Sequence, residues 1–142
     1  MPETIVPLII ADIYELAGSL RQNGETIAAA VGQTQARWQV MSAASGGRYT
    51  VPQIARRLGV SRQNVQRIAD LLVEDGSATF DDNPDHRGSP YLTLSKAGTA
   101  TLAKLSKAAA GYHATLADKM SAAEIAALHR GLRKLIAAVN SN

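Results

Sequence analysis

The sequence contains no cysteine among its 142 residues. A disulfide framework, a zinc–thiolate centre, a cysteine nucleophile and a thiol redox switch are therefore excluded. Aromatic residues make up only 4% of the chain, and alanine supplies much of its 46% hydrophobic fraction. Because small side chains bury little area each, a second subunit is expected to complete the hydrophobic core.

Long hydrophobic runs are also absent, since no stretch approaches the ~20 apolar residues of a membrane helix. The N-terminus has neither the basic region nor the small-residue cleavage site of a signal peptide. We therefore expect a cytoplasmic protein without membrane contact, built as one domain or one domain with an appendage.

Catalytic signatures are missing as well. The sequence has no phosphate-cradling glycine loop, nucleophile elbow or His–Glu metal motif. The three histidines are far apart in the chain, which gives a zinc site little support. We predict a protein that is not an enzyme and that uses no cofactor or metal.

The charges are unevenly distributed, although the net charge is only +3. Five arginines and no acidic residue lie between Arg48 and Ala69. Such a local excess attracts a polyanion, although a solvated helix surface has the same composition.

Hydrophobic periodicity predicts a mainly α fold of the α+β class. Helices are expected over residues 4–21 and 34–44, with an alanine-rich connection between Gly24 and Gly32. Further helices are expected from Thr50 to the glycine at 59, over residues 61–75, from Ser95 onward and from Ser121 onward. Residues 78–81 and 91–94 alternate as the strands of a hairpin, and the segment between them is rich in turn residues.

Local signals mark the ends of the central helices. Thr50 and Gln53 form a capping-box pattern, and Gly59 supplies the positive φ that ends that helix. Ser61 caps the next helix, and Ser121 with Glu124 forms a second capping box. Both serines are interpreted as caps rather than as nucleophiles.

Two helices joined by a tight Gly-Val-Ser turn and followed by a hairpin are typical of a winged helix-turn-helix. The second helix buries Val65, Ile68, Ala69 and Leu72, which leaves its arginine and amide side chains outward. Arginine can pair with guanine and Asn or Gln with adenine in the major groove. The candidate DNA-binding residues are Arg48, Thr50, Arg56, Arg57, Ser61, Arg62, Gln63, Asn64, Gln66, Arg67, Asp85, His86 and Arg87.

The hairpin tip carries its own signal. A guanidinium such as that of Arg87 can enter the minor groove, where the potential is most negative over A·T-rich steps. Asp85 is expected to hold Arg87 through an ion pair, and the alternative is an ordinary Asp–Arg pair of a solvated loop. His86 is interpreted as a solvated imidazole that can touch a phosphate when it is protonated.

Four segments together resemble the MarR family of bacterial transcriptional regulators. They are the run from Thr34 to Met41, the run from Val51 to Arg67, the segment Asn83-Pro-Asp-His-Arg and the segment Leu94-Ser-Lys-Ala-Gly. The resemblance implies a winged helix-turn-helix at residues 33–96, with residues 1–32 and 97–142 interlocking as the helical dimerisation region of an obligate homodimer. It also implies that the helix from Ser61 reads the major groove and that Asp85 and Arg87 serve the minor groove.

The sequence departs from the family pattern at two positions. Gly88 stands where many relatives carry a second basic residue, which predicts a weaker wing contact. Ser95 replaces the usual threonine, and either hydroxyl can cap the long helix that follows.

Homodimerisation is also indicated by the terminal helices themselves. Apolar stripes Ile5–Leu20, Leu102–Met120 and Ile125–Val139 lie outside the small winged core and would remain partly exposed in one chain. The alternative is a self-contained helical subdomain without a partner.

The expected function is sequence-specific binding of double-stranded DNA as a transcription regulator, with repression as the expected outcome and a pseudo-palindromic operator. Many relatives release DNA when a small aromatic or phenolic effector binds, and Tyr14, Trp38, Met41, Tyr112 and His113 are the candidate pocket residues, with core packing as the alternative for each. The alternative function is a protein–protein adaptor, although the polar face argues against it.

Overall fold

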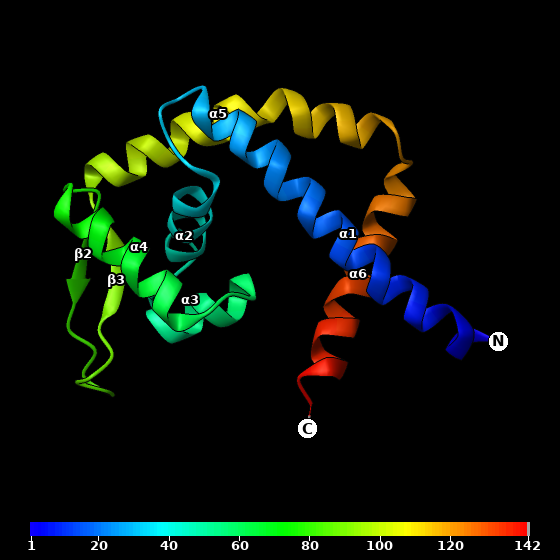
Figure 1. The fold of residues 1–142 in the computed structure, drawn as a ribbon, viewed down its shortest axis with the longest axis horizontal. Helices are drawn as coiled ribbons and strands as arrows, with labels where there is room; N and C mark the ends of the chain where they lie inside the picture. The colour runs from blue at the N-terminus through cyan, green and yellow to red at the C-terminus, as the bar shows by residue number, and fades with distance from the viewer. Residues whose placement is uncertain (142) are drawn as a thin grey trace. The chain divides into compact units, whose positions relative to one another are not determined.

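The computed structural model describes residues 1–141, which form helices and one small antiparallel sheet (Figure 1). In chain order the elements are α1 (Pro2–Ala29), α2 (Gln35–Ser45), β1 (Tyr49–Thr50), α3 (Val51–Leu58), α4 (Arg62–Glu74), β2 (Ala78–Asp81), β3 (Tyr91–Leu94), α5 (Lys96–Asp118) and α6 (Ala122–Val139). The prediction of a mainly α fold with a winged helix-turn-helix is confirmed. The chain divides into two compact units, Met1–Ala108 and the residues from Ala109 onward.

The core of the first unit is formed by α2, α3, α4 and the sheet. α2 packs against α3 and α4, and α4 packs against β2. The inward residues predicted for α4 are all buried, and so are Trp38, Val40 and Met41 of α2. Figure 1 shows the loop between β2 and β3 extending beyond these helices, which is the form of a wing.

The structure contains the hydrogen bonds of the predicted helix caps. The Thr50 hydroxyl accepts a hydrogen bond from the Gln53 N–H, and the Gln53 side chain accepts one from the Thr50 N–H at 2.8 Å. Gly59 has a φ of +68°, and the Ser61 hydroxyl accepts the Asn64 N–H at 3.1 Å. These local interactions define the turn between α3 and α4.

The sheet has three strands, so the prediction of a two-stranded hairpin was incomplete. β1 pairs antiparallel with β3, with Tyr49 opposite Leu92 and Thr50 opposite Tyr91. A two-residue strand is too short to show alternation, and Thr50 gave only the signal of a helix cap. β1 ties the start of α3 to the base of the wing.

α1 is longer than predicted, because Gly24 does not end it. The helix continues to Ala29, and Gly32 with a φ of +73° lies in the turn that follows. Gly24 is buried, and a Cβ there would lie 2.7 Å from Cγ of Gln35. Glycine at this position therefore allows close packing between α1 and α2 rather than a break in the helix.

The last two helices begin as predicted. The Ser95 hydroxyl accepts the Gly98 N–H at 3.1 Å, and Ser121 with Glu124 forms the expected capping box. A hydrogen bond from the Ser121 backbone N–H lowers the pKa of Glu124 below its ordinary value. α5 ends at Asp118, so Met120, the last residue of the predicted Leu102–Met120 stripe, lies outside the helix.

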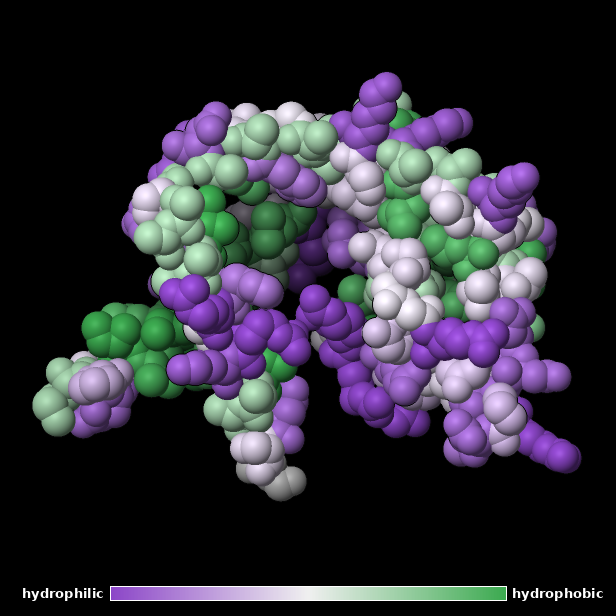
Figure 2. Space-filling model, turned by 180° about the vertical axis from the view of Figure 1, so that it is seen from behind, coloured by the Kyte–Doolittle hydropathy of each residue, from purple (hydrophilic) through white to green (hydrophobic). Residues whose placement is uncertain are grey.

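The terminal helices expose much of their apolar surface. Ile125, Leu128 and Val139 of α6 are exposed, as expected for an apolar stripe that one chain leaves partly uncovered. Ile5, Leu16 and Leu20 of α1 are exposed as well. Figure 2 shows a mainly hydrophobic surface over the first turns of α1.

No helix within residues 1–141 combines the length and the apolar character that crossing a membrane requires.

An ion pair between Arg37 and Asp75 joins the N-terminal turn of α2 to the C-terminal cap of α4. The carboxylate of Asp75 also accepts the Ser77 N–H at 3.1 Å. Desolvation raises the pKa of Asp75, but the hydrogen bonds from Ser77 and Arg37 outweigh it and hold the pKa below its ordinary value.

We expect Asp75→Asn to destabilise the fold by at most about 1 kcal/mol at pH 7, because the Asp75 side chain is 44% exposed and water screens the pair. A carboxyl whose pKa is lower in the folded than in the unfolded state stabilises the fold fully at a pH above the unfolded-state pKa. This stabilisation is lost as the pH falls through the folded-state pKa. The melting temperatures of wild type and variant should therefore converge as the pH falls below the lowered folded-state pKa of Asp75, and Asp82→Asn serves as the control. A difference that persists there would contradict a charge effect.

Candidate nucleic-acid interface

The outward side of α4 presents cationic and amide side chains to solvent. Arg62, Gln63, Gln66 and Arg67 are exposed, and Asn64 is half-buried. Within residues 1–141 none of the arginines of α4 forms an ion pair with a carboxylate. The arginines of this face are therefore not directly paired with an acidic side chain.

Hydrogen bonds along α4 orient part of this face. Nη2 of Arg67 donates to Oδ1 of Asn64 at 3.0 Å, and Nε2 of Gln66 donates to Oδ1 of Asp70 at 2.9 Å. The Gln63 side chain makes no hydrogen bond to any described residue, and its full amide remains available. Of the three amide residues of α4 among the candidate DNA-binding residues, Gln63 is thus the least engaged.

Two predicted contact residues serve the helices themselves. The hydroxyls of Thr50 and Ser61 both accept backbone N–H groups at the starts of α3 and α4. Thr50 is buried, whereas Ser61 is exposed at the positive end of α4. That end of the helix favours a nearby phosphate.

The wing exposes Asp85, His86 and Arg87, the three residues predicted for its tip. The expected ion pair between Asp85 and Arg87 is absent from the described structure. Both side chains extend into solvent from the tip, where an exposed pair gains little from forming. The Arg87 guanidinium is thus unpaired at the end of the wing.

At the end of the sheet where the wing loop begins, the Arg48 guanidinium lies over the ring of Tyr91 at 5.5 Å from its centroid. This cation–π contact holds an exposed arginine beside the base of the wing. Arg48, α4 and the wing tip all belong to the first unit.

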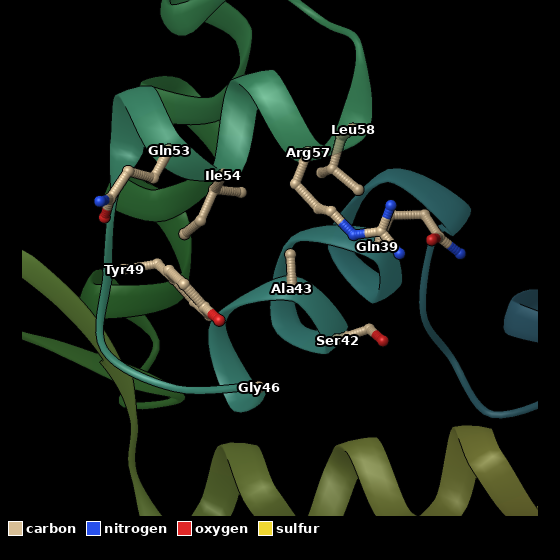
Figure 3. Close-up of a pocket in the computed structure, with 9 residues that line it drawn as sticks. All are labelled: Gln39, Ser42, Ala43, Gly46, Tyr49, Gln53, Ile54, Arg57 and Leu58. Carbon is tan, nitrogen blue, oxygen red and sulfur yellow. The ribbon is translucent and has the colours of Figure 1, made fainter. Parts of the chain in front are cut away.

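Arg57 differs from the other candidate DNA-binding residues in its surroundings. It lines a pocket of about 640 Å³ between α2 and α3, and Figure 3 shows its guanidinium extending toward Gln39. Arg56, the neighbouring candidate, is exposed. The sequence did not predict this pocket, because its lining combines residues of α2, β1 and α3 that only the packing of these elements brings together. The lining residues are Gln39, Ser42, Ala43, Gly46, Tyr49, Gln53, Ile54, Arg57 and Leu58.

None of the residues predicted for an effector pocket lines this space. Trp38 and Met41 are buried in the core, as the alternative interpretation held, and Tyr14 is 76% exposed on α1. Tyr112 and His113 lie on α5 with their ring centroids 6.2 Å apart. A cleft that these five residues share stays a prediction. In the described part of the chain no group of three or more His, Asp or Glu could hold a metal ion.

The sequence did not predict one buried residue of the wing, because it lies in a segment rich in turn residues. Asn83 is only 9% exposed and hydrogen-bonds across the loop. The Asn-Pro dipeptide was the available signal, since Asn often bonds the backbone two residues on in such turns.

Residues 37–100 match the family model described as winged helix-turn helix. Uncharacterized proteins of Mycobacterium tuberculosis and Mycobacterium bovis are 47% identical to this chain over 133 residues, which are 94% of this chain and 93% of theirs. The match includes the terminal helices as well as the winged region.

Solved structures share the fold at lower identity. A MarR/EmrR family transcriptional regulator from Acinetobacter sp. ADP1 superposes with a TM-score of 0.82 at 22% identity, covering 97% of this chain and 99% of the other. A mutant of E. coli MarR complexed with operator DNA gives 0.71 at 21% identity, with 93% and 95% covered. CouR from Rhodococcus jostii RHA1 bound to p-coumaroyl-CoA gives 0.77 at 12% identity, with 87% and 88% covered. The chain therefore belongs to one family with the two mycobacterial proteins, and its winged helix-turn-helix fold is that of the MarR regulators.

Proposed function

We propose that this chain is a transcription regulator that binds double-stranded DNA sequence-specifically. The observation that carries this proposal is the exposed face of α4, whose arginines form no ion pair with a carboxylate in the described structure. Arginine and Gln side chains on such a face can pair with base edges in the major groove. The E. coli MarR mutant of the same fold is complexed with operator DNA, which supports the same use of the fold here.

In this proposal the protein binds DNA as a homodimer. The exposed apolar residues of α1 and α6 support it, because a stable monomer rarely leaves contiguous apolar patches of this kind in water. Two α4 helices related by a two-fold axis would enter successive major grooves about 34–36 Å apart. The operator would then be pseudo-palindromic, and a bound dimer would act as a repressor by occupying it.

A small aromatic or phenolic effector would release the DNA. The likeness to CouR, which was solved with p-coumaroyl-CoA bound, supports an organic ligand of this kind. Tyr14, Tyr112 and His113 remain the proposed contacts, since they are not part of the winged core.

Arg87→Ala is expected to weaken duplex binding without unfolding the protein, because Arg87 is exposed at the wing tip and has no ion-pair partner within residues 1–141. The slope of log affinity against log salt should fall by about 1 for one lost phosphate or minor-groove contact. Gel-shift titrations at several salt concentrations measure both quantities.

Gly88→Arg provides the opposite change at the neighbouring position. A Cβ there would meet only the His86 ring, at 3.7 Å, so the backbone can carry a side chain. The added charge should tighten binding and raise the slope by about 1. Unchanged affinity in both variants would refute a DNA contact by the wing.

A further inference from the structure

The loop between β2 and β3 is long for a hairpin, yet it is closed around one buried polar side chain. Hairpin loops of two to five residues are the common lengths, and this connection runs from Asp82 to Pro90. Asn83 is 9% exposed, whereas Asp85, His86 and Arg87 beyond it are exposed. A buried polar group inside an otherwise solvated loop needs hydrogen-bond partners from the loop itself.

Asn83 has such partners on both ends of its amide. Its Oδ1 accepts the Asp85 N–H at 3.1 Å, and its Nδ2 donates to the carbonyl of Ser89 at 3.1 Å. Its own carbonyl accepts the His86 N–H at 3.1 Å, and the His86 carbonyl accepts the Ser89 N–H at 3.1 Å. One side chain therefore joins both arms of the loop, and two backbone bonds complete the closure.

This closure determines how Arg87 is presented. Arg87 lies between His86 and Ser89, whose backbone groups are held by the bonds just described. A side chain on an ordered loop loses less conformational freedom on binding than one on a mobile loop. With no ion pair to Asp85, it is the backbone of the loop that fixes the position from which the Arg87 side chain extends.

We propose that Asn83 is the positioning residue of the wing, which holds the loop in the conformation that presents Arg87 to a DNA groove. This inference rests on the proposed function, but the effect of Asn83 on the conformation of the loop can be measured without DNA. Asn83 itself touches no nucleic acid in this proposal and acts through Arg87.

The test combines Asn83→Ala, Arg87→Ala and the double variant, with Ser89→Ala as the matched control, since Ser89 contributes only backbone groups to the closure. Backbone amide exchange of the DNA-free protein should accelerate at Asp85 and His86 in Asn83→Ala and remain unchanged in Ser89→Ala. The probe is a duplex that the wild type binds. Its affinity should fall about tenfold in Asn83→Ala, because two hydrogen bonds of the loop are lost and bonds to water replace part of their free energy. In the Arg87→Ala background, Asn83→Ala should lower the affinity for the duplex by less than about threefold.

Equal losses in the two backgrounds would overturn the proposal, because Asn83 would then act independently of Arg87. Unchanged amide exchange in Asn83→Ala would overturn it as well. If Asn83→Ala does not fold, Asn83→Asp keeps the acceptor for the Asp85 N–H and loses the Nδ2 donor, and its affinity loss should again depend on Arg87. If the wild type binds no duplex, the proposed function fails, and so does the role of Asn83 in presenting Arg87 to DNA. Amide exchange then still decides whether Asn83 holds the loop.

Discussion

Replacing Gly98 with alanine is expected to destabilise the protein by about 2–3 kcal/mol, the cost of forcing a methyl group into a filled site. A Cβ on Gly98 would lie 2.0 Å from the carbonyl oxygen of Ser77 and 3.0 Å from its carbonyl carbon. Because both atoms belong to the backbone, no side-chain rotation can relieve the overlap.

The surrounding junction explains why the backbone cannot simply move away. The Ser95 N–H donates to the Ser77 carbonyl at 2.9 Å, and the Ser95 hydroxyl donates to the Gly76 carbonyl. The Gly98 N–H in turn donates to the Ser95 hydroxyl. The N-terminus of α5 is thereby bonded to the turn that follows α4, and Gly98→Ala should loosen α4 and the wing together.

Gly111→Ala is the matched control on the same helix. A Cβ there would meet nothing within 4 Å, so the substitution should be neutral or stabilise the fold by up to about 1 kcal/mol through helix propensity. Chemical denaturation of both variants measures the difference. If Gly98→Ala proved as stable as Gly111→Ala, the close packing of α5 on this turn would be contradicted.

Alanine at Gln63 and Asn64 is expected to change which DNA sequence is bound, and alanine at Arg56 and Arg57 to change only how strongly binding depends on salt. A good bidentate amide–adenine pair contributes about 1–3 kcal/mol of discrimination, which is roughly a 5- to 150-fold preference. A lost phosphate contact weakens all sequences alike and lowers the salt slope by about 1.

The structure ranks the members of each pair. The Asn64 oxygen already accepts a bond from Arg67, so Gln63→Ala should change the preference more. Arg57 lines the pocket between α2 and α3, so Arg56→Ala should change the salt slope more. Selection from random duplexes and salt titrations of the four single variants separate these effects. A changed sequence preference in Arg56→Ala with none in Gln63→Ala would reverse the assignment.

Local signals explain why so much of the winged region could be predicted. Caps such as Thr50, Ser61 and Ser121 act on N–H groups three residues away, and the positive φ of Gly59 is a property of one residue. The inward face of α4 follows from its own periodicity. These features need no knowledge of distant segments.

The missed features depend on contacts that the periodicity of a single helix or strand does not show, either between separate segments or across a loop. Gly24 continues a helix because it packs on Gln35, and β1 exists because β3 lies beside it. Asn83 is buried by a loop that closes around it. The apolar stripes of α1 and α6 were correctly located in sequence, but a single chain does not bury them.

Selection of genomic fragments by the purified wild-type protein tests the central claim most directly. We predict enrichment of fragments that share a pseudo-palindromic site whose half-sites lie about one helical turn apart. Enrichment of no fragment, even at low salt, would contradict a role for α4 and the wing in binding DNA.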